Sequence, residues 1–256
     1  MKKGKASQPK YAPMCWVRAV MLALGRKTPG LAAKALWPEK ATWTLLQPYY
    51  DGLHMPDLLG KPRKGQSGDI RKLLLSHPVQ ARWLRLMYWM AIDPQVELSE
   101  LFMEAARLDI RFRYFAVHEG VFPDVPWQPA VVDARSWLLQ MREFMKTDDV
   151  FDLMDIAAMA VLQIRVARLS GNSPARHLGQ TAFLECWYKL RKRPEMDGIH
   201  TSIFEHVWNT FCSNHFAATS PDDIRPEDER SFLVWDYQKM ATDMGWPEVV
   251  TCLATK

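Results

Sequence analysis

Apolar side chains recur at helical spacing along most of this chain. In residues 14–24 they repeat every three or four positions, which predicts the buried face of a helix, and Gly25 ends the run. The same spacing predicts further helices over residues 31–37, 41–50, 69–75, 79–92, 93–108, 133–146, 149–169, 177–191, 201–216 and 226–245. Residues 110–116 alternate apolar side chains with arginines and are either a strand or the tail of a helix. The pattern predicts a mainly α fold.

The strongest helical pattern covers residues 149–169. Asp148 and Asp149 stand at its start, where acidic side chains favour the helix dipole, and Arg165 and Arg168 stand in its last turn, just before Gly171. Its apolar stripe consists of Val150, Leu153, Met154, Ala157, Val161 and Ile164. We expect this helix to be the centre of a bundle, and the stripe is too short to require a coiled-coil dimer.

Composition narrows the class of protein. The 256 residues are 48% apolar with 12 Gly, enough for one large or two modest helical domains. The four Cys lack a CxxC pair, which indicates reduced thiols in a cytoplasmic protein. Residues 14–24 are similar to the apolar core of a secretory signal, but Arg18 interrupts them and no cleavage site follows. No apolar run approaches the roughly 20 residues that span a bilayer, so we expect no membrane contact.

Charge is distributed unevenly along the chain. Residues 1–92, the N-terminal third, carry 16 Lys and Arg against four Asp and Glu, a balance of +12, whereas the other 164 residues carry 17 against 25, a balance of −8. Such a split is typical of a protein with one polyanion-binding end, although a solvated basic surface without a ligand is the alternative. With the proline-rich run at 122–129 as a crossover, it predicts a basic flexible arm at 1–13, a basic subdomain at 14–92, a connecting segment at 93–130 and an acidic helical bundle at 131–256.

Residues 29–56 read as two short helices joined by a tight turn. Thr28 and Pro29 form a helix start, with Thr28 as the N-cap and proline at the first helical position. Small side chains at Ala32, Ala33 and Ala35 would allow close helix packing, and Pro38 would stop this helix. The following helix would bury Trp43, Leu46 and Tyr50.

Two parts of this region carry a resemblance to a known family. Residues 31–36 resemble the second helix of the Cro and lambda-repressor class of helix-turn-helix proteins, and Tyr50, Asp51, Gly52 and Pro56 resemble the closure after that family's recognition helix. About residues 14–75 are covered. Residues 37–40 replace the usual turn glycine, and Pro48 falls inside the would-be recognition helix. The resemblance implies a helix-turn-helix-like subdomain followed by a helical bundle, with DNA as the ligand; a helical subdomain that does not bind DNA is the alternative.

The resemblance also implies which side chains face nucleic acid. The first residues of a recognition helix enter the major groove, so the candidates there are Lys40, Thr42, Thr44 and Gln47. A glycine-rich loop then adds Lys61, Arg63 and Lys64, which suit phosphate contacts, and the next helix continues the basic face with Arg71 and Lys72. The loop lacks the order of residues of a P-loop, which argues against nucleotide hydrolysis.

Signals for an enzyme or a metal site are sparse. Arg113 and His118 match the loose Arg-to-His spacing of HEPN ribonucleases, with Tyr114 where that family favours a small polar residue. Cys212 and His215 lie one helical turn apart, which is half of a zinc site, but no second pair with metal-ligand spacing completes it. No hydrolase, metalloprotease or dinucleotide-binding motif is present. We expect no cofactor and no metal.

These observations predict a bacterial, cytoplasmic regulator that binds nucleic acid, DNA in preference to RNA, through its basic N-terminal third. Its acidic helical part would provide contacts to protein partners or a homodimer. The alternative is a non-catalytic subunit of a larger protein or nucleoprotein complex, for which the many Trp and Met residues would supply interface. A ribonuclease centred on Arg113 and His118 is a third hypothesis.

Overall fold

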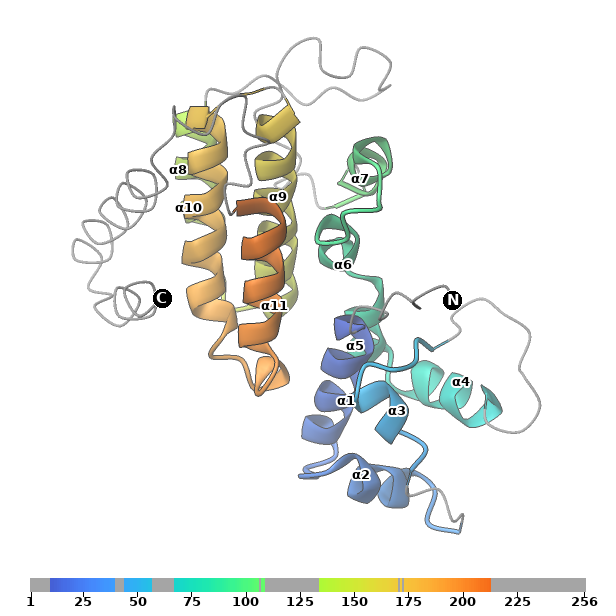
Figure 1. The fold of residues 1–256 in the computed structure, drawn as a ribbon. Coiled ribbons are helices and arrows are strands. Elements are labelled where there is room, and N and C mark those ends of the chain that lie inside the picture. The colour runs from blue at the N-terminus through green and yellow to red at the C-terminus, as the bar shows by residue number, and fades with distance from the viewer. Residues whose placement is uncertain are drawn as a thin grey trace, which may run out of the picture.

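The computed structural model describes residues 10–39, 44–56, 67–105, 107–108, 134–169, 171 and 173–212. Within these ranges every regular element is a helix, which confirms the mainly α prediction (Figure 1). The helices are α1 (Tyr11–Ala23), α2 (Pro29–Leu36), α3 (Gln47–Tyr50), α4 (Ser67–Ser76), α5 (Pro78–Ala81), η1 (Arg82–Arg85), α6 (Met87–Ala91), α7 (Leu98–Ala105), α8 (Ala134–Phe144), α9 (Val150–Leu169), α10 (Ser173–Leu190), η3 (Pro194–Met196), α11 (His200–Val207) and η4 (Trp208–Cys212). None of these helices has both the length and the apolar character needed to cross a membrane.

Helix α1 is the hub of the N-terminal helices. It starts three residues before the predicted position and buries Trp16, Val17 and Val20 completely. It packs against α2, α3, α5 and η1, and against η3 from the C-terminal part. Gly25 ends it as predicted, because a φ of 61° is a left-handed conformation that glycine adopts without strain.

Residues 79–92 form three short helices instead of the predicted single one. The break lies at Leu86, which adopts an extended conformation between η1 and α6. The indole N–H of Trp89 donates to the carbonyl oxygen of Trp83 at 2.6 Å, so a side chain takes an acceptor that a continuous helix would use internally. The predicted inward residues Trp83, Leu84 and Met87 are nevertheless buried.

The centre of the C-terminal part is α9, as predicted. Figure 1 shows α9 beside α10, η4 also packs against α9, and α10 also packs against α8. The predicted single stripe is wrong, however, because α9 is buried on nearly all sides from Phe151 to Ala167. Gly179 permits close packing of α10 on α9, since a Cβ there would lie 2.9 Å from Cγ1 of Ile164.

The N-terminal helices and the C-terminal bundle share one hydrophobic core. A continuous cluster of buried residues runs from Ala12 in α1 to Cys212 in η4. Polar contacts join the same parts: the guanidinium of Arg18 donates to the carbonyl oxygen of Asp197 at 3.0 Å, and the hydroxyl of Tyr11 donates to that of Ser202 at 3.3 Å. A displacement of α1 would therefore disturb the bundle as well.

Several predicted segments lie outside the described residues. They are most of the arm at 1–13, the segment at 110–116, the proline-rich run at 122–129 and the helix at 226–245. The division of the chain at residues 93–130 stays a prediction, because most of that segment is not described. The predicted helix at 201–216 begins one residue earlier, as α11, and continues through the π-helical η4 to Cys212.

Candidate nucleic-acid interface

The first half of the helix-turn-helix region has the predicted local structure. The hydroxyl of Thr28 accepts a hydrogen bond from the backbone N–H of Leu31 at 3.2 Å, which caps α2, and Pro29 is the first helical residue. Ala32 and Ala33 are fully buried, and α2 packs against α1. Small side chains therefore mediate this contact, whereas Ala35 is exposed.

The second half differs from the prediction. The expected helix at 41–50 is wrong for residues 44–46, which form a turn and a bend, and α3 is a single turn from Gln47 to Tyr50. The physical reason is Pro48, which lies in the first turn of α3, where its missing N–H costs nothing. Leu46 is fully buried as predicted, but Tyr50 is half-buried, with the guanidinium of Arg18 4.3 Å from its ring centroid.

The closure after α3 depends on Gly52. Its φ of 68° is left-handed, and a Cβ there would lie 2.9 Å from Sδ of Met14 and 3.2 Å from the backbone nitrogen of Lys10. That nitrogen donates to the carbonyl oxygen of Gly52 at 3.1 Å, so the chain just before α1 lies directly against this turn. The glycine at position 52 therefore reflects a steric requirement.

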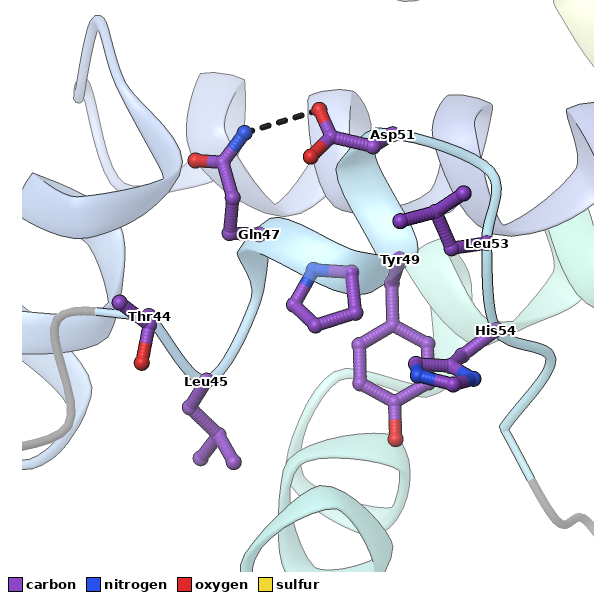
Figure 2. Close-up of a pocket in the computed structure, with 8 residues that line it drawn as sticks. Thr44, Leu45, Gln47, Tyr49, Asp51, Leu53 and His54 are labelled. Atoms are coloured by element: carbon purple, nitrogen blue, oxygen red, sulfur yellow. Dashed lines mark hydrogen bonds between the residues drawn. The ribbon is translucent and has the colours of Figure 1, made fainter.

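Thr44 and Gln47 lie at a shallow pocket with a cavity volume of about 260 Å³ (Figure 2). Thr44 is exposed and Gln47 is half-buried. The amide nitrogen of Gln47 donates to Oδ1 of Asp51 at 2.8 Å, so one polar group of this side chain is already satisfied within α3. The pair thus faces a small cavity beside a single helical turn, a different setting from the start of a long recognition helix.

Two aromatic residues of this pocket were missed by the sequence reasoning. Tyr49 packs edge-on against Trp16 with ring centroids 5.7 Å apart, and His54 lies edge-on to Tyr49 at 6.2 Å. Burial raises the pKa of Tyr49 above its ordinary value of 10, so its hydroxyl stays protonated at neutral pH. The sequence spacing of Tyr49 and His54 did not predict that they share a pocket, because the turn at Gly52 brings them together and helical periodicity does not.

Arg71 and Lys72 lie on the outer face of α4. Both are exposed, while Ile70 and Leu73 on either side of them are buried in the core. The predicted basic face of this helix is therefore accessible. The other candidates, Lys40, Thr42, Lys61, Arg63 and Lys64, lie outside the described residues. The structure thus describes four of the nine candidates, and the pocket that Thr44 and Gln47 line does not include Arg71 or Lys72.

Most described cations of the N-terminal third point into solvent. Eight of the nine are exposed, and the exception is the half-buried Arg18. The exposed ones are Lys10, Arg26, Lys27, Lys34, Arg71, Lys72, Arg82 and Arg85. In the described part of the chain the side chains of Arg71, Lys72 and Arg85 form no ion pair, so their charges are available to a polyanion.

The described residues offer no set of three metal-ligating side chains. Cys212 is a buried free thiol whose pKa is raised by burial, and a ring nitrogen of His206 lies 2.9 Å from the carbonyl oxygen of Ile92. His215, Arg113 and His118 lie outside the described residues, so the ribonuclease hypothesis stays a prediction. Cys15 and Cys186 are likewise buried free thiols.

Comparison with known proteins does not assign this chain to a family. No protein family, no curated protein and no solved structure matches this chain. The candidate interface therefore depends on its own residues alone.

Proposed function

We propose that this chain is a bacterial, cytoplasmic DNA-binding regulator that contacts the phosphodiester backbone through its N-terminal third. The observation that supports this most is the exposure of eight of the nine described cations in a segment with a charge balance of +12. In this proposal α1, α2 and α3 belong to a helix-turn-helix-like subdomain, and the bundle from α8 onward is its scaffold. The capped α2, the buried Ala32 and Ala33 and the turn at Gly52 support that view.

The short α3 changes how such a subdomain would read DNA. A helix of four residues presents few side chains to base edges, so contacts to phosphate would supply most of the affinity. Binding of this kind is steeply dependent on salt, since each neutralised phosphate releases condensed counterions. DNA is favoured over RNA by the helix-turn-helix resemblance.

Removing both exposed cations of α4 tests the proposal. We expect the variant Arg71→Gln/Lys72→Gln to bind duplex DNA about tenfold more weakly near physiological salt, and its plot of log affinity against log salt to be about 1.8 less steep. Fluorescence anisotropy with labelled duplex DNA, at about 50 and 200 mM salt, measures both quantities. Single-stranded DNA and RNA competitors then rank the ligands.

The matched control is Arg107→Gln/Arg168→Gln, which removes the same charge elsewhere. Arg107, just after α7, is paired with Glu104 in that helix, and Arg168 donates to the carbonyl oxygen of Thr210 at 3.0 Å. We expect this control to bind DNA like the unaltered protein. An affinity of the unaltered protein that does not change between the two salt concentrations would contradict the proposal.

A second candidate is a non-catalytic subunit of a larger complex. The observation that favours it is the exposure of Leu75 at the end of α4 and Val79 in α5, which are 74% and 62% exposed. The two helices pack against each other, so these side chains belong to neighbouring surfaces.

For that candidate we expect light scattering to show an assembly heavier than 29.6 kDa, because apolar surface of this kind is covered in complexes. The variant Leu75→Ser/Val79→Ser should shift the assembly toward the monomer without loss of helix content. A well-behaved monomer from the unaltered protein, alone and after gentle purification from its source, would count against this candidate.

A further inference from the structure

A dense run of cations lies at the end of α10 and in the turn after it. Lys189, Arg191, Lys192 and Arg193, here called the α10 basic cluster, place four positive charges within five residues. They belong to residues 93–256, whose charge balance is −8, so the net charge of that part does not reveal them. The following helix, η3, packs against α1, which brings this end of the bundle to the N-terminal helices (Figure 1).

Neutral partners hold three of these cations in place. The ammonium group of Lys189 donates to the carbonyl oxygen of Met145 at the end of α8, and the guanidinium of Arg193 donates to that of Asp148 at 2.6 Å. Lys192 donates to the hydroxyl of Tyr188 at 3.2 Å. A carbonyl or hydroxyl oxygen orients a cation but does not cancel its charge, so these contacts leave the positive charges of Lys189 and Lys192 in place.

The ring of Tyr188 contacts two cations of the cluster, Arg191 and Lys192. The Arg191 guanidinium lies 4.6 Å from the ring centroid and the Lys192 ammonium 4.3 Å from it. Two cations on one half-buried ring are pre-positioned by cation–π attraction, which reduces the side-chain entropy lost when they bind an anion.

Cations of the N-terminal third converge on the same end of the bundle. The guanidinium of Arg82 lies 4.5 Å from the ring centroid of Phe151, in the first turn of α9, and Trp83 packs on the same ring at 5.4 Å. The guanidinium of Arg193 donates to the carbonyl oxygen of Asp148, which lies three residues before Phe151. Arg82 from η1 and Arg193 from the α10 basic cluster therefore both reach the turn between α8 and α9.

Three carboxylates lie at that turn. Oδ1 of Asp149 accepts from the backbone N–H groups of Phe151 and Asp152, which caps α9, and Oδ2 of Asp152 accepts from the hydroxyl of Thr147. Asp148 lies 3.8 Å from Arg193 with its side chain 98% exposed, so solvent screens this pair strongly. Glu195 in η3 and Asp197 just after it lie at this end as well, so the four cations of the cluster with Arg82 and Arg85 stand against five carboxylates.

We propose that the α10 basic cluster is a second contact for the phosphodiester backbone of a bound nucleic acid. The strand held by the N-terminal third continues across Arg82 and Arg85 onto the end of the bundle, so both parts of the chain hold one ligand. This inference rests on the proposed function. It gives the acidic C-terminal part of the chain a direct part in binding.

The variant Lys192→Gln/Arg193→Gln tests the inference in the full chain. Anisotropy with duplex DNA should show about tenfold weaker binding near physiological salt and a salt dependence less steep by about 1.8, as for the α4 variant. Combining the four substitutions should lower the slope by about 3.6. Because Arg193 also holds the turn, Lys192→Gln alone serves as a second variant, with an expected loss of about three- to fivefold. In the described part of the chain the ammonium group of Lys192 contacts Tyr188 and no carboxylate.

The outcomes separate this inference from the proposed function. Weaker binding in the α4 variant, together with unchanged affinity and slope in both variants of the α10 basic cluster, would overturn the second contact alone. An unaltered protein that does not bind duplex DNA at low salt would overturn both. Arg107→Gln/Arg168→Gln is again the charge-matched control, since α9 separates Arg168 from Phe151 by nearly its full length.

Discussion

Replacing Arg142 by methionine is expected to lower the free energy of unfolding by about 3–5 kcal/mol. Its guanidinium binds both carboxylate oxygens of Glu185, with Nε at 3.0 and 3.1 Å and Nη2 at 2.6 Å from Oε1. The side chain of Glu185 is only 2% exposed, so the variant leaves a carboxylate in the core without its cation. The cost arises from that unpaired charge, because a carboxylate that is 2% exposed has little contact with water, although Arg142 itself is 32% exposed.

The control for this prediction is Lys146→Met. Lys146 also pairs with a glutamate, Glu143, at 2.6 Å, but the two side chains are 71% and 67% exposed. We expect its loss to cost less than about 1 kcal/mol. Urea denaturation followed by circular dichroism measures both variants, and the double variant Arg142→Met/Glu185→Leu should recover part of the loss because it removes both charges. Equal losses for the two single variants would show that the Arg142 pair is not a buried one.

Replacing Arg165 by methionine is expected to cost about 3 kcal/mol and to loosen α6 and α7 from the bundle. Its guanidinium donates to three carbonyl oxygens, those of Ala91 at 2.9 Å, Asp93 at 3.1 Å and Val96, which close the end of α6 and the chain before α7. Burial lowers the pKa of Arg165 and Asp93 opposes that shift, but an arginine remains charged at neutral pH.

Hydrogen exchange provides a readout specific to this contact. Amides of residues 87–105 should exchange faster in Arg165→Met, while those in the centre of α9 should change only as far as global stability does. Arg168→Met is the control, since Arg168 is exposed and donates to Thr210 within the C-terminal part. Uniformly faster exchange across the whole chain would contradict the assigned role, because it would mean that Arg165 supports overall stability alone.

Capping residues and helix-ending glycines predicted those helix ends that depend only on residues close by in the sequence. Thr28 caps α2 and Pro29 opens it because an N-cap needs only the next three residues, and Gly25 ends α1 because only its own backbone is involved. The prediction of one continuous helix over residues 79–92 was wrong because the cause of the break is not local. The spacing there is helical, but the indole of Trp89 turns back onto Trp83 and competes for a backbone acceptor, which periodicity does not reveal.

The candidate site shows the same division. The exposure of Arg71 and Lys72 followed from the amphipathic pattern of α4, since Ile70 and Leu73 take the buried face. The setting of Thr44 and Gln47 did not, because Pro48 delays α3 and the turn at Gly52 brings Tyr49 and His54 to the same pocket. That Arg82 and Arg193 both reach the turn between α8 and α9 depends on tertiary packing.

The sequence by itself determined the helical class, the end of α1 at Gly25, the start of α2, the central place of α9 and the uneven charge. Tertiary structure alone decided which distant groups meet. Arg142 and Glu185 are 43 residues apart, and Arg165 lies 69 residues from Val96. Helix caps and apolar periodicity act over one or two helical turns, so they can be recognised in the amino-acid sequence alone. A pairing between distant residues depends on how helices cross, and that is set by the packing of the whole core.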